Sequence, residues 1–323
     1  MMSSYEYARL KNYFLKYLSR EEFITMLSAD SIESAIKSIV EKPLGAKLYE
    51  IIHLRTYSLN DLYRIIDHFN NERIEFIMSQ VNKKHKRLLE AFNKIFDVIN
   101  IWSILSCLRR GKKPSLIYPL GKTFLLDLSE IKDYQQLNRI LPVDLKVLVD
   151  YFNIYGIDDI YSIIKVYDKL RDYIHMDFRV RKVYGFIRDS IFLKLCLSLE
   201  QSPSKFPSLI VFTHDEAIEA CSVKELSNLP SVIRGFNPIY SVFSDLLSDL
   251  FRISPSHELF DLGISLYASN LSSDLIYSDG ELVVRIYIIG IAEALITKTI
   301  LGALYSGLNI DDLKNIIQRW WVL

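Results

Sequence analysis

The sequence predicts an all-α fold, and three observations predict it: few turn residues, apolar stripes at helical spacing, and frequent helix-start signals. The 323 residues include 11 glycines and 9 prolines, roughly half of the usual shares of about 7% and 5%. Folds built from many short strands need more turns than this. Half of the residues are hydrophobic, which predicts packed cores rather than disorder, and the length allows two or three domains.

Helical stripes and caps recur along the chain. Apolar side chains return every three or four residues across 7–17 and 62–69, which is the spacing of one helix face. Capping boxes, in which serine or threonine precedes glutamate by three positions, mark four helix starts: Ser19–Glu22, Thr213–Glu216, Ser222–Glu225 and Ser278–Glu281. Ser254, followed by proline, predicts another start. Segments 115–118 and 208–211 could form short strands, but their context favours helix.

One short pattern occurs three times in the chain: an acid, an aliphatic residue, an aromatic residue, any residue, and a second aliphatic residue. The copies begin at Asp61, Asp159 and Glu258, spaced by 98 and 99 residues. Each copy is followed, 30 to 36 residues later, by an acid in a strongly apolar helical stretch, namely Asp97, Asp189 and Glu293. Self-similarity at a fixed period indicates related structural units.

The repeat also predicts how the units divide the chain. Short cap-and-helix segments follow the first two of these acids, at 132–141 and 222–233, whereas the third copy has too few residues left for one. A segment of the missing type lies at 29–40. We therefore expect three helical units in a closed, pseudo-threefold arrangement: 46–141, 142–234, and 235–323 completed by 1–45. Chance recurrence of short amphipathic patterns is the alternative.

The common catalytic and metal-binding motifs are missing from the sequence. Gly121-Lys122-Thr123 ends like a phosphate-binding loop, but Leu116 stands where that motif needs glycine. The six histidines never fall four residues apart, and no paired-cysteine zinc spacing exists. Glu293 could act as a general acid if burial raised its pKa, but pairing with a basic residue of a neighbouring helix is favoured. We assign no catalytic, cofactor-binding or metal-binding residue.

Cysteine usage and hydropathy bear on location. Cys107, Cys196 and Cys221 are widely spaced, and two lie in apolar helical stretches, which predicts buried free thiols in a reducing compartment. The longest uncharged runs, 262–273 and 299–310, have 12 residues each, whereas a membrane span needs about 20. The N-terminal residues lack the apolar region of a signal peptide. We therefore expect neither a membrane span nor a signal peptide.

Charge is unevenly distributed although the formal net charge is zero. Zero net charge gives no electrostatic reason to expect nucleic acid as a partner. Residues 81–113 carry nine basic residues against two acids, and residues 215–281 carry eleven acids against three basic residues. These stretches are either solvated faces or two surfaces that meet different partners. The basic stretch could instead contact anionic lipid or nucleic acid, but it carries no recognisable binding module.

Several motifs together resemble one protein family. The opening stretch 5–27 combines a tyrosine-rich helix with a Leu-Ser-x-Glu-Glu start, and residues 97–101 read DVINI, an Asp-x-x-Asn-Ile signature. Gly121 follows at a family glycine position, and Glu293 and Lys298 fit the family's C-terminal Glu-Ile-x-Asn-Leu-Arg pattern. Over essentially its whole length the chain resembles the C subunit of archaeal A-type ATP synthases, which is related to the d subunit of V-type ATPases.

The resemblance implies a funnel of three helical units that sits on the membrane rotor ring. Such a protein lies on the cytoplasmic face of the cell membrane and receives the foot of the central shaft. It transmits torque between the proteolipid ring and the ATP-synthesising head, and it needs no active site, cofactor, small-molecule substrate or nucleic acid. The structural or partner-contact candidates are Asp97, Asn100, Asp189, Glu293 and Lys298. A polar stripe from Asn93 to Ser103 either faces the funnel or makes buried hydrogen bonds between units, and the second is favoured.

Two other functions stay open at this point. A helical-repeat scaffold unrelated to ATPases would bind peptides or proteins on a concave surface, and it would also lack a catalytic site. An enzyme with a helical core would use Glu293 or the segment 121–123. The enzyme hypothesis predicts a deep pocket there, with at least two convergent polar groups.

Overall fold

The protein is a helical molecule with the short helices on the outside. The computed structural model describes residues 4–54, 57–129, 131–199, 209–308 and 310–323. Helix accounts for 76% of the structure, and the residues so described contain no strand. The all-α prediction is confirmed.

For description, the helices after α1 (Ser4–Tyr13) are divided into three consecutive series. The first series is α2 (Arg20–Leu27), α3 (Ile32–Lys37), α4 (Pro43–Leu54), α5 (Leu59–Gln80) and α6 (Lys83–Arg109). The second is the 3-10 turn η2 (Lys122–Leu125), α7 (Tyr134–Ile140), α8 (Val143–Tyr155), α9 (Tyr161–Leu170) and α10 (Phe178–Leu199). The third is α11 (His214–Cys221), α12 (Leu229–Ile233), α13 (Pro238–Ile253), α14 (His257–Ser272) and α15 (Asp279–Ser306). Helix α16 (Ile310–Trp320) follows.

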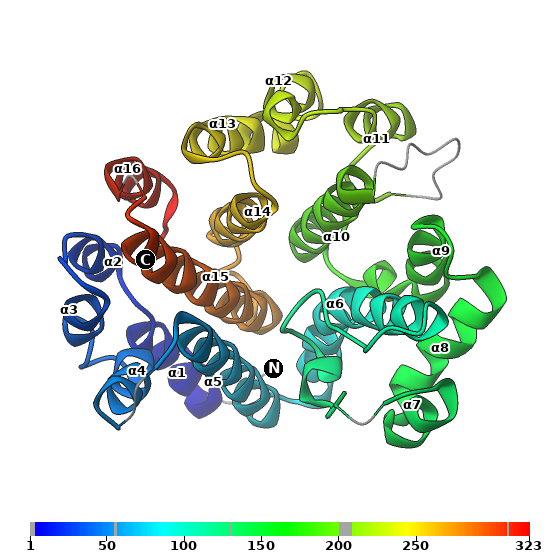
Figure 1. Cartoon of the computed structure of the whole chain (residues 1–323), viewed down its shortest axis with the longest axis horizontal. Coiled ribbons are helices and arrows are strands. Elements are labelled where there is room, and N and C mark those ends of the chain that lie inside the picture. The colour runs from blue at the N-terminus through cyan, green and yellow to red at the C-terminus, as the bar shows by residue number, and fades with distance from the viewer. Residues whose placement is uncertain (1–3, 55–56, 130, 200–208, 309) are drawn as a thin grey trace.

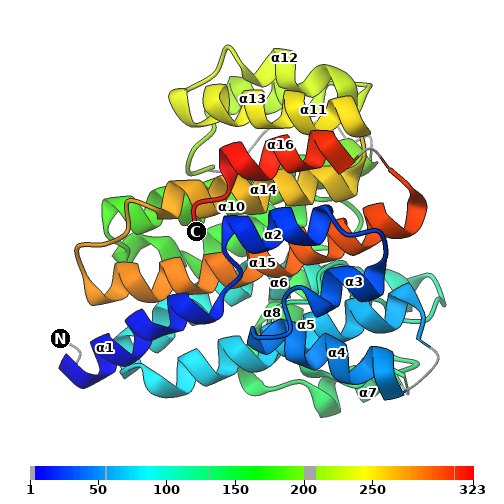
Figure 2. The ribbon, with the colours of Figure 1, turned by 90° about the vertical axis from the view of Figure 1, so that its left-hand side faces the viewer.

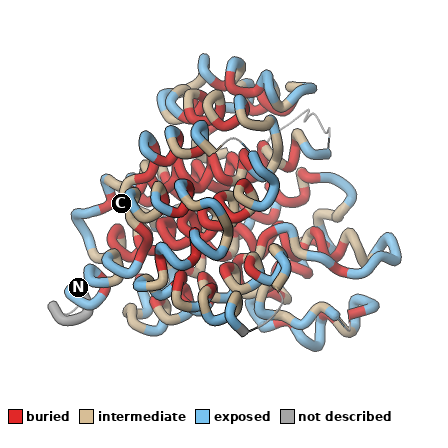
Figure 3. Tube along the Cα trace, turned by 60° about the vertical axis from the view of Figure 1, so that its left-hand side comes forward, coloured by how far each residue is buried: buried red, intermediate tan, exposed pale blue. Residues whose placement is uncertain are grey.

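The long helices lie inside the molecule. Figure 1 shows α5, α6, α10, α14 and α15 toward the centre, with α2–α4, α7–α9, α11–α13 and α16 around them. Helix α15 packs against α14 and α5, and α14 packs in turn against α10. Buried residues are concentrated along these inner helices (Figure 3). The apolar helical stretches of the sequence therefore form the core.

Most of the predicted helix starts are present. The capping boxes at Ser19, Thr213 and Ser278 open α2, α11 and α15, with both reciprocal hydrogen bonds formed. A further box opens α5, where Ser58 pairs with aspartate rather than glutamate at the third helical position.

Three local predictions are wrong. Ser222 ends α11 instead of starting a helix. The start predicted at Ser254 is displaced, because Ser256 accepts the capping bond from the Leu259 N–H and α14 begins after it. Segments 115–118 and 209–211 are not helical; the latter prediction began at residue 208, which lies outside the described residues. Both segments cross long helices and bond to their buried side chains, as shown below.

The three copies of the acid pattern have similar local surroundings. Asp61, Asp159 and Glu258 are exposed and lie at the start of α5, just before α9 and in the first turn of α14. Asp159 caps its helix by accepting the Ser162 N–H at 3.1 Å. In every copy the following aliphatic residue is buried: Leu62, Ile160 and Leu259. The repeated pattern therefore marks helix starts with one inward-facing side chain.

Among the residues that the structure describes, two helices are long and apolar enough to cross a membrane, which the counting of uncharged runs did not predict. They are α6 and α15, each of which contains an 18-residue apolar window with at most two charged residues. The rest of the protein buries 83% of the window in α6 and 78% of that in α15. Core helices of water-soluble proteins show this degree of burial.

The cysteines are free, as predicted. Cys196 of α10 and Cys221 at the end of α11 are buried, and Cys107 is half-buried. Burial raises the pKa of the Cys196 thiol, with a further contribution from a hydrogen bond to Cys221. A buried thiol with a raised pKa is unreactive.

Candidate functional site

Three of the long helices, α6, α10 and α15, hold a buried carboxylate near the middle, and each of these carboxylates binds a segment that crosses the helix. The three are Asp97 on α6, Asp189 on α10 and Glu293 on α15, with no more than 1% of any residue exposed. All three accept a backbone N–H from the crossing segment. They are also the three acids that the repeat singled out.

The first crossing segment is bound by Asp97 and Asn100. Asp97 Oδ1 accepts from the Thr123 N–H and hydroxyl, both at 2.8 Å. The Asn100 Oδ1 accepts from the Ile117 and Tyr118 N–H groups at 3.1 and 2.9 Å, while its Nδ2 donates back to the same segment. Burial raises the pKa of Asp97 to about 6, and the Thr123 bonds oppose that rise.

Gly121 allows this crossing segment to approach the helix. Its φ is 82°, which favours glycine, and a Cβ at this position would lie 2.4 Å from the Asp97 Oδ1. The neighbouring Lys122 Nζ pairs with Asp144 at 2.5 Å and lies 4.0 Å from Glu90. The segment that resembles a phosphate-binding loop therefore gives its Thr123 N–H to a carboxylate of the protein itself.

The second crossing segment is bound by Asp189. Its Oδ2 accepts from the Ile210 and Val211 N–H groups at 2.8 and 2.7 Å. Its Oδ1 forms a salt bridge of 2.9 Å with the adjacent, equally buried Arg188. Gly185, one turn earlier on α10, makes room, because a Cβ there would lie 2.5 Å from the Ile210 side chain.

The third crossing segment comes from the N-terminal part of the chain. Glu293 Oε1 accepts the Leu18 N–H at 2.7 Å, and its Oε2 pairs with Arg73 of α5 at 2.5 Å. The Arg73 guanidinium also lies over the rings of Tyr17 and Phe69, at 4.3 and 4.6 Å from their centroids. The interpretation of Glu293 as one member of an ion pair with a neighbouring helix is confirmed.

Segments near the two ends of the chain meet beside this crossing. The Arg20 N–H donates to the Leu323 carbonyl at 2.7 Å, and the Trp321 indole donates to the Leu18 carbonyl at 3.1 Å. Helix α2 packs against α16 and α15. The N-terminal helices thus lie against the third series of helices.

The remaining members of the polar stripe on α6 are also hydrogen-bonded. Asn93 Oδ1 accepts from the Tyr287 hydroxyl of α15 at 2.8 Å. The Ser103 hydroxyl donates to the Ser115 carbonyl at 3.0 Å. Within this stripe, Asn93 reaches a different helical series, whereas the other members bind the segment that follows their own helix.

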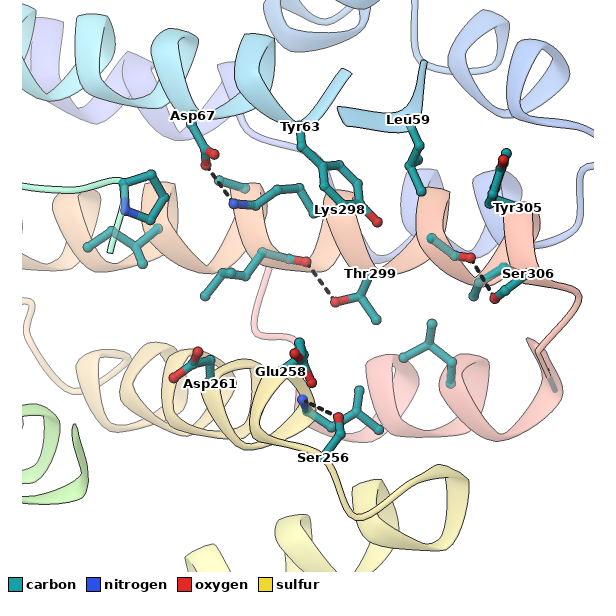
Figure 4. A pocket seen from close by; sticks show the side chains of 18 of the residues that line it. Leu59, Tyr63, Asp67, Ser256, Glu258, Asp261, Lys298, Thr299, Tyr305 and Ser306 are labelled. Carbon is teal, nitrogen blue, oxygen red and sulfur yellow. Dashed lines mark hydrogen bonds and ion pairs between the residues drawn. The ribbon is translucent and has the colours of Figure 1, made fainter. Parts of the chain in front are cut away.

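A cavity of about 600 Å³ lies against the C-terminal half of α15. Its other walls are the first halves of α5 and α14 and the residues 117–120 (Figure 4). Lys298, a predicted site residue, reaches across it to Asp67 at 2.6 Å. Burial raises the pKa of Asp67, although Lys298 acts in the opposite direction. The wall is mostly apolar with a few polar side chains, as in many binding sites.

Further polar side chains line the cavity, among them Asp261, Glu258 and Asn70. Asp261 pairs with Lys194 at 2.5 Å and accepts from the Tyr118 hydroxyl at 3.3 Å. Glu258 is exposed at the start of α14. Asn70 is 4% exposed, and its Oδ1 has no hydrogen-bond partner in the described structure. This oxygen lies against α15, because a Cβ on Gly290 would be 3.1 Å from it, so the exposed Glu258 carboxylate is the more accessible polar group for an occupant.

Sequence reasoning found Lys298 in this cavity but missed the other polar groups. Glu293 and the segment 121–123 do not line it, so the pocket is not where the enzyme hypothesis placed it. Asp67 and Asn70 form an Asp-x-x-Asn pair on one face of α5, the same spacing as Asp97 and Asn100 on α6. The second occurrence of Asp-x-x-Asn was therefore the one feature of the sequence that could have pointed to these cavity residues.

Comparisons with known proteins do not place the chain in a family. No protein-family model matches the sequence, and no match was found among curated proteins. Among the residues that the structure describes, no three His, Cys, Asp or Glu side chains are grouped so that they could hold a metal ion.

Proposed function

We propose that this chain is a non-catalytic central-stalk subunit of a rotary A/V-type ATP synthase. In this role it would couple the rotor shaft to the membrane proteolipid ring and transmit torque for ion transport and ATP synthesis. The observation that carries the proposal is the threefold recurrence of a long helix whose buried carboxylate binds a crossing segment. The family resemblance of the sequence points the same way.

The recurrence suits a closed funnel of three units. The first two crossing segments follow their helices in sequence, whereas the third comes from residue 18, more than 270 positions away. A third unit completed by the N-terminal residues needs such a contact. Three equivalent units around a pseudo-threefold axis are the arrangement that we propose for this body.

The crossings also supply the rigidity that torque transmission needs. Each one joins an irregular segment to the middle of a long helix through buried, charge-assisted hydrogen bonds, which are stronger than neutral ones. Opening them would leave a carboxylate buried without its donors, which costs free energy. A body fastened in this way at three places resists twisting of its units against one another.

We assign the shaft to the end of the molecule that contains the cavity. An apolar hollow with the Asp67–Lys298 pair and the exposed Glu258 carboxylate can receive the foot of a shaft that supplies a hydrogen-bond donor. The opposite end of α15 would then face the proteolipid ring on the cytoplasmic side of the membrane.

Affinity purification from membranes of the source cell tests this function. The tagged chain should co-purify with ATP-hydrolysing subunits and a proteolipid ring. Thr299→Trp, which fills the cavity, should release the shaft, whereas Val242→Trp, at an exposed position of α13, should not. A tagged chain recovered from membranes without ATPase activity or proteolipid would contradict the proposal.

The second candidate is a helical scaffold that binds a peptide in the same cavity. The mostly apolar wall of the cavity, with a few polar side chains, favours it, because pockets of this kind bind peptide side chains. The same purification separates the two functions. A scaffold would retain a Thr299-sensitive partner in preparations that contain no ATPase.

A further inference from the structure

Helices α6, α10 and α15 begin close together at one end of the molecule. Glu281, in the first turn of α15, lies 3.7 Å from Arg179 of α10. A Cβ on Gly280 would lie 3.5 Å from the His85 ring of α6. Figure 2 shows α15 crossing the molecule from this end on the left to its C-terminal end on the right. The shared end is therefore opposite the part of α15 that lines the cavity.

This end, which we call the basic end, consists of residues 83–87, 174–182 and 274–281. It carries seven cations against four acids, a net charge of +3 with histidine neutral. The cations are Lys83, Lys84, Lys86, Arg87, Arg179, Arg181 and Lys182, and the acids are Asp177, Asp274, Asp279 and Glu281. All of the cations except the half-buried Lys182 are exposed.

The placement of the cations works against the stability of α6. This helix has no acid in its first turn and begins with Lys83 and Lys84. Cations near a helix N-terminus are unfavourable, because the helix dipole places partial positive charge there. Helix α10 differs, because Asp177 precedes it and accepts the Val180 N–H at 3.0 Å. An anionic partner at this end would reverse the sign of the interaction at α6.

The same end exposes large apolar side chains. Phe178 is 82% exposed, Tyr277 73% and Ile276 53%. The Arg179 guanidinium lies over the Tyr277 ring, 4.2 Å from its centroid. Aromatic and aliphatic side chains among basic residues match the interface of a bilayer, where the rings sit at headgroup level and the cations meet lipid phosphates.

We propose that the basic end binds the headgroup region of an anionic phospholipid bilayer. A single-stranded nucleic acid would instead use aromatic platforms in a basic groove. Here the cations lie on the outer ends of helices, and one face of the Tyr277 ring already carries the Arg179 guanidinium. The coupling function turns this same end toward the proteolipid ring, and the proposal adds lipid headgroups beside that ring as a partner. Lipid binding can be tested without any other protein.

Vesicle sedimentation of the purified chain tests the proposal. The probes are vesicles of phosphatidylcholine alone and vesicles with about one-third phosphatidylglycerol, which supplies the anionic surface. Binding should require the anionic lipid and weaken with added salt. The double variant Lys83→Glu/Lys84→Glu should lower the partition coefficient at least about tenfold, since each basic residue near the surface contributes about 1 kcal/mol.

A matched variant at the other end of α6 controls for net charge. Lys112→Glu/Lys113→Glu makes the same charge change at exposed positions and should leave binding within about twofold. Phe178→Ser/Tyr277→Ser should weaken binding while retaining its salt dependence. Circular dichroism establishes that each variant is folded.

Several results would overturn the proposal. These are equal loss in the two lysine variants, equal binding to both vesicle types, or binding to single-stranded nucleic acid that outcompetes the vesicles. The co-purification experiment is unaffected by any of them, since it depends on the cavity and on protein partners. If the co-purification failed, the vesicle sedimentation would still test lipid binding independently.

Discussion

The crossings at Asp97 and Glu293 solve the same structural problem with different chemistry. Both carboxylates are buried in the middle of a long helix, and both accept a backbone N–H from a crossing segment. Glu293 is balanced by the buried Arg73 at 2.5 Å. Asp97 has no cation within 4 Å among the described residues, and hydrogen bonds from Thr123 and a raised pKa take the place of one.

This comparison shows which feature of the crossings is constant and which one varies. An acceptor facing the crossing segment is present at every crossing, including Asp189. The compensation of the charge varies. It comes from a cation of another helix at Glu293 and from the adjacent arginine at Asp189, whereas at Asp97 hydrogen bonds act first and the charge of Lys122 contributes less. We infer that the acceptor fixes the architecture and that the charge is compensated locally.

Removing the partner of Glu293 should have the largest effect. Arg73→Met leaves a buried carboxylate unpaired and should lower the free energy of unfolding by about 3–5 kcal/mol in urea denaturation. Adding Glu293→Gln should restore part of this, because the amide oxygen still accepts the Leu18 N–H without a charge. Arg109→Met, which breaks an exposed pair with Asp158, should change stability by less than about 1 kcal/mol. If the double variant were no more stable than Arg73→Met alone, the unpaired charge of Glu293 would not be the cause of the loss.

The backbone approach at Asp97 can be tested with two glycines of the same conformation. Gly121 and Gly156 have φ of 82° and 85° and extended ψ, a region that costs other residues about 1–3 kcal/mol. An alanine Cβ meets Asp97 at 2.4 Å in the first case and nothing within 4 Å in the second. Gly121→Ala should therefore destabilise by about 1–2 kcal/mol more than Gly156→Ala. Equal losses in thermal and urea unfolding would refute the close approach.

The pH dependence of stability should distinguish Asp97 from the other acids. Its folded pKa of about 6 lies above the ordinary 3.8, so the folded state binds more protons than the unfolded state between these values. Stability from this group is therefore greatest at low pH and falls as pH rises through about 4 to 6. Asp97→Asn should remove a fall on the order of 3 kcal/mol, seen as the difference between the two urea profiles. Parallel profiles would contradict the raised pKa.

The smallest change in the free energy of unfolding should come from replacing Lys122, the partly exposed cation beside the Asp97 crossing. Lys122 pairs with Asp144 and Glu90 while about a third of its side chain is exposed. Lys122→Met should therefore change the free energy of unfolding by less than about 1 kcal/mol. A loss comparable to that of Arg73→Met would mean that Lys122 acts as the counter-charge of Asp97.

The sequence predicted the features that depend on local chemistry. Helices follow from apolar periodicity, and the boxes at Ser19, Thr213 and Ser278 follow from neighbouring residues alone. The spacing of the repeat singled out Asp97, Asp189 and Glu293, which proved to be buried at equivalent crossings. What these acids bind was not predictable, since segments 115–118 and 209–211 are not helical and hydrogen bonds to distant side chains take the place of those of a helix.

The cavity was harder to predict than the crossings. Its wall combines the first halves of α5 and α14 with the end of α15, elements that lie up to about 240 residues apart in the chain. Nothing local distinguishes Glu258 or Asp261 from other helix-start acids. The Asp67–Asn70 spacing alone carried a signal, and it gained meaning only when Lys298 was found opposite.

The meeting of Leu18 and Arg20 with Glu293, Trp321 and Leu323 has a consequence for biosynthesis. The earlier residues leave the ribosome long before their partners exist, and loop closure over such a separation is among the slowest steps in folding. The first two crossings can form while the chain is still being made. The third must wait until nearly all of it has emerged, so the nascent protein carries an unfinished apolar surface that chaperones would be expected to cover.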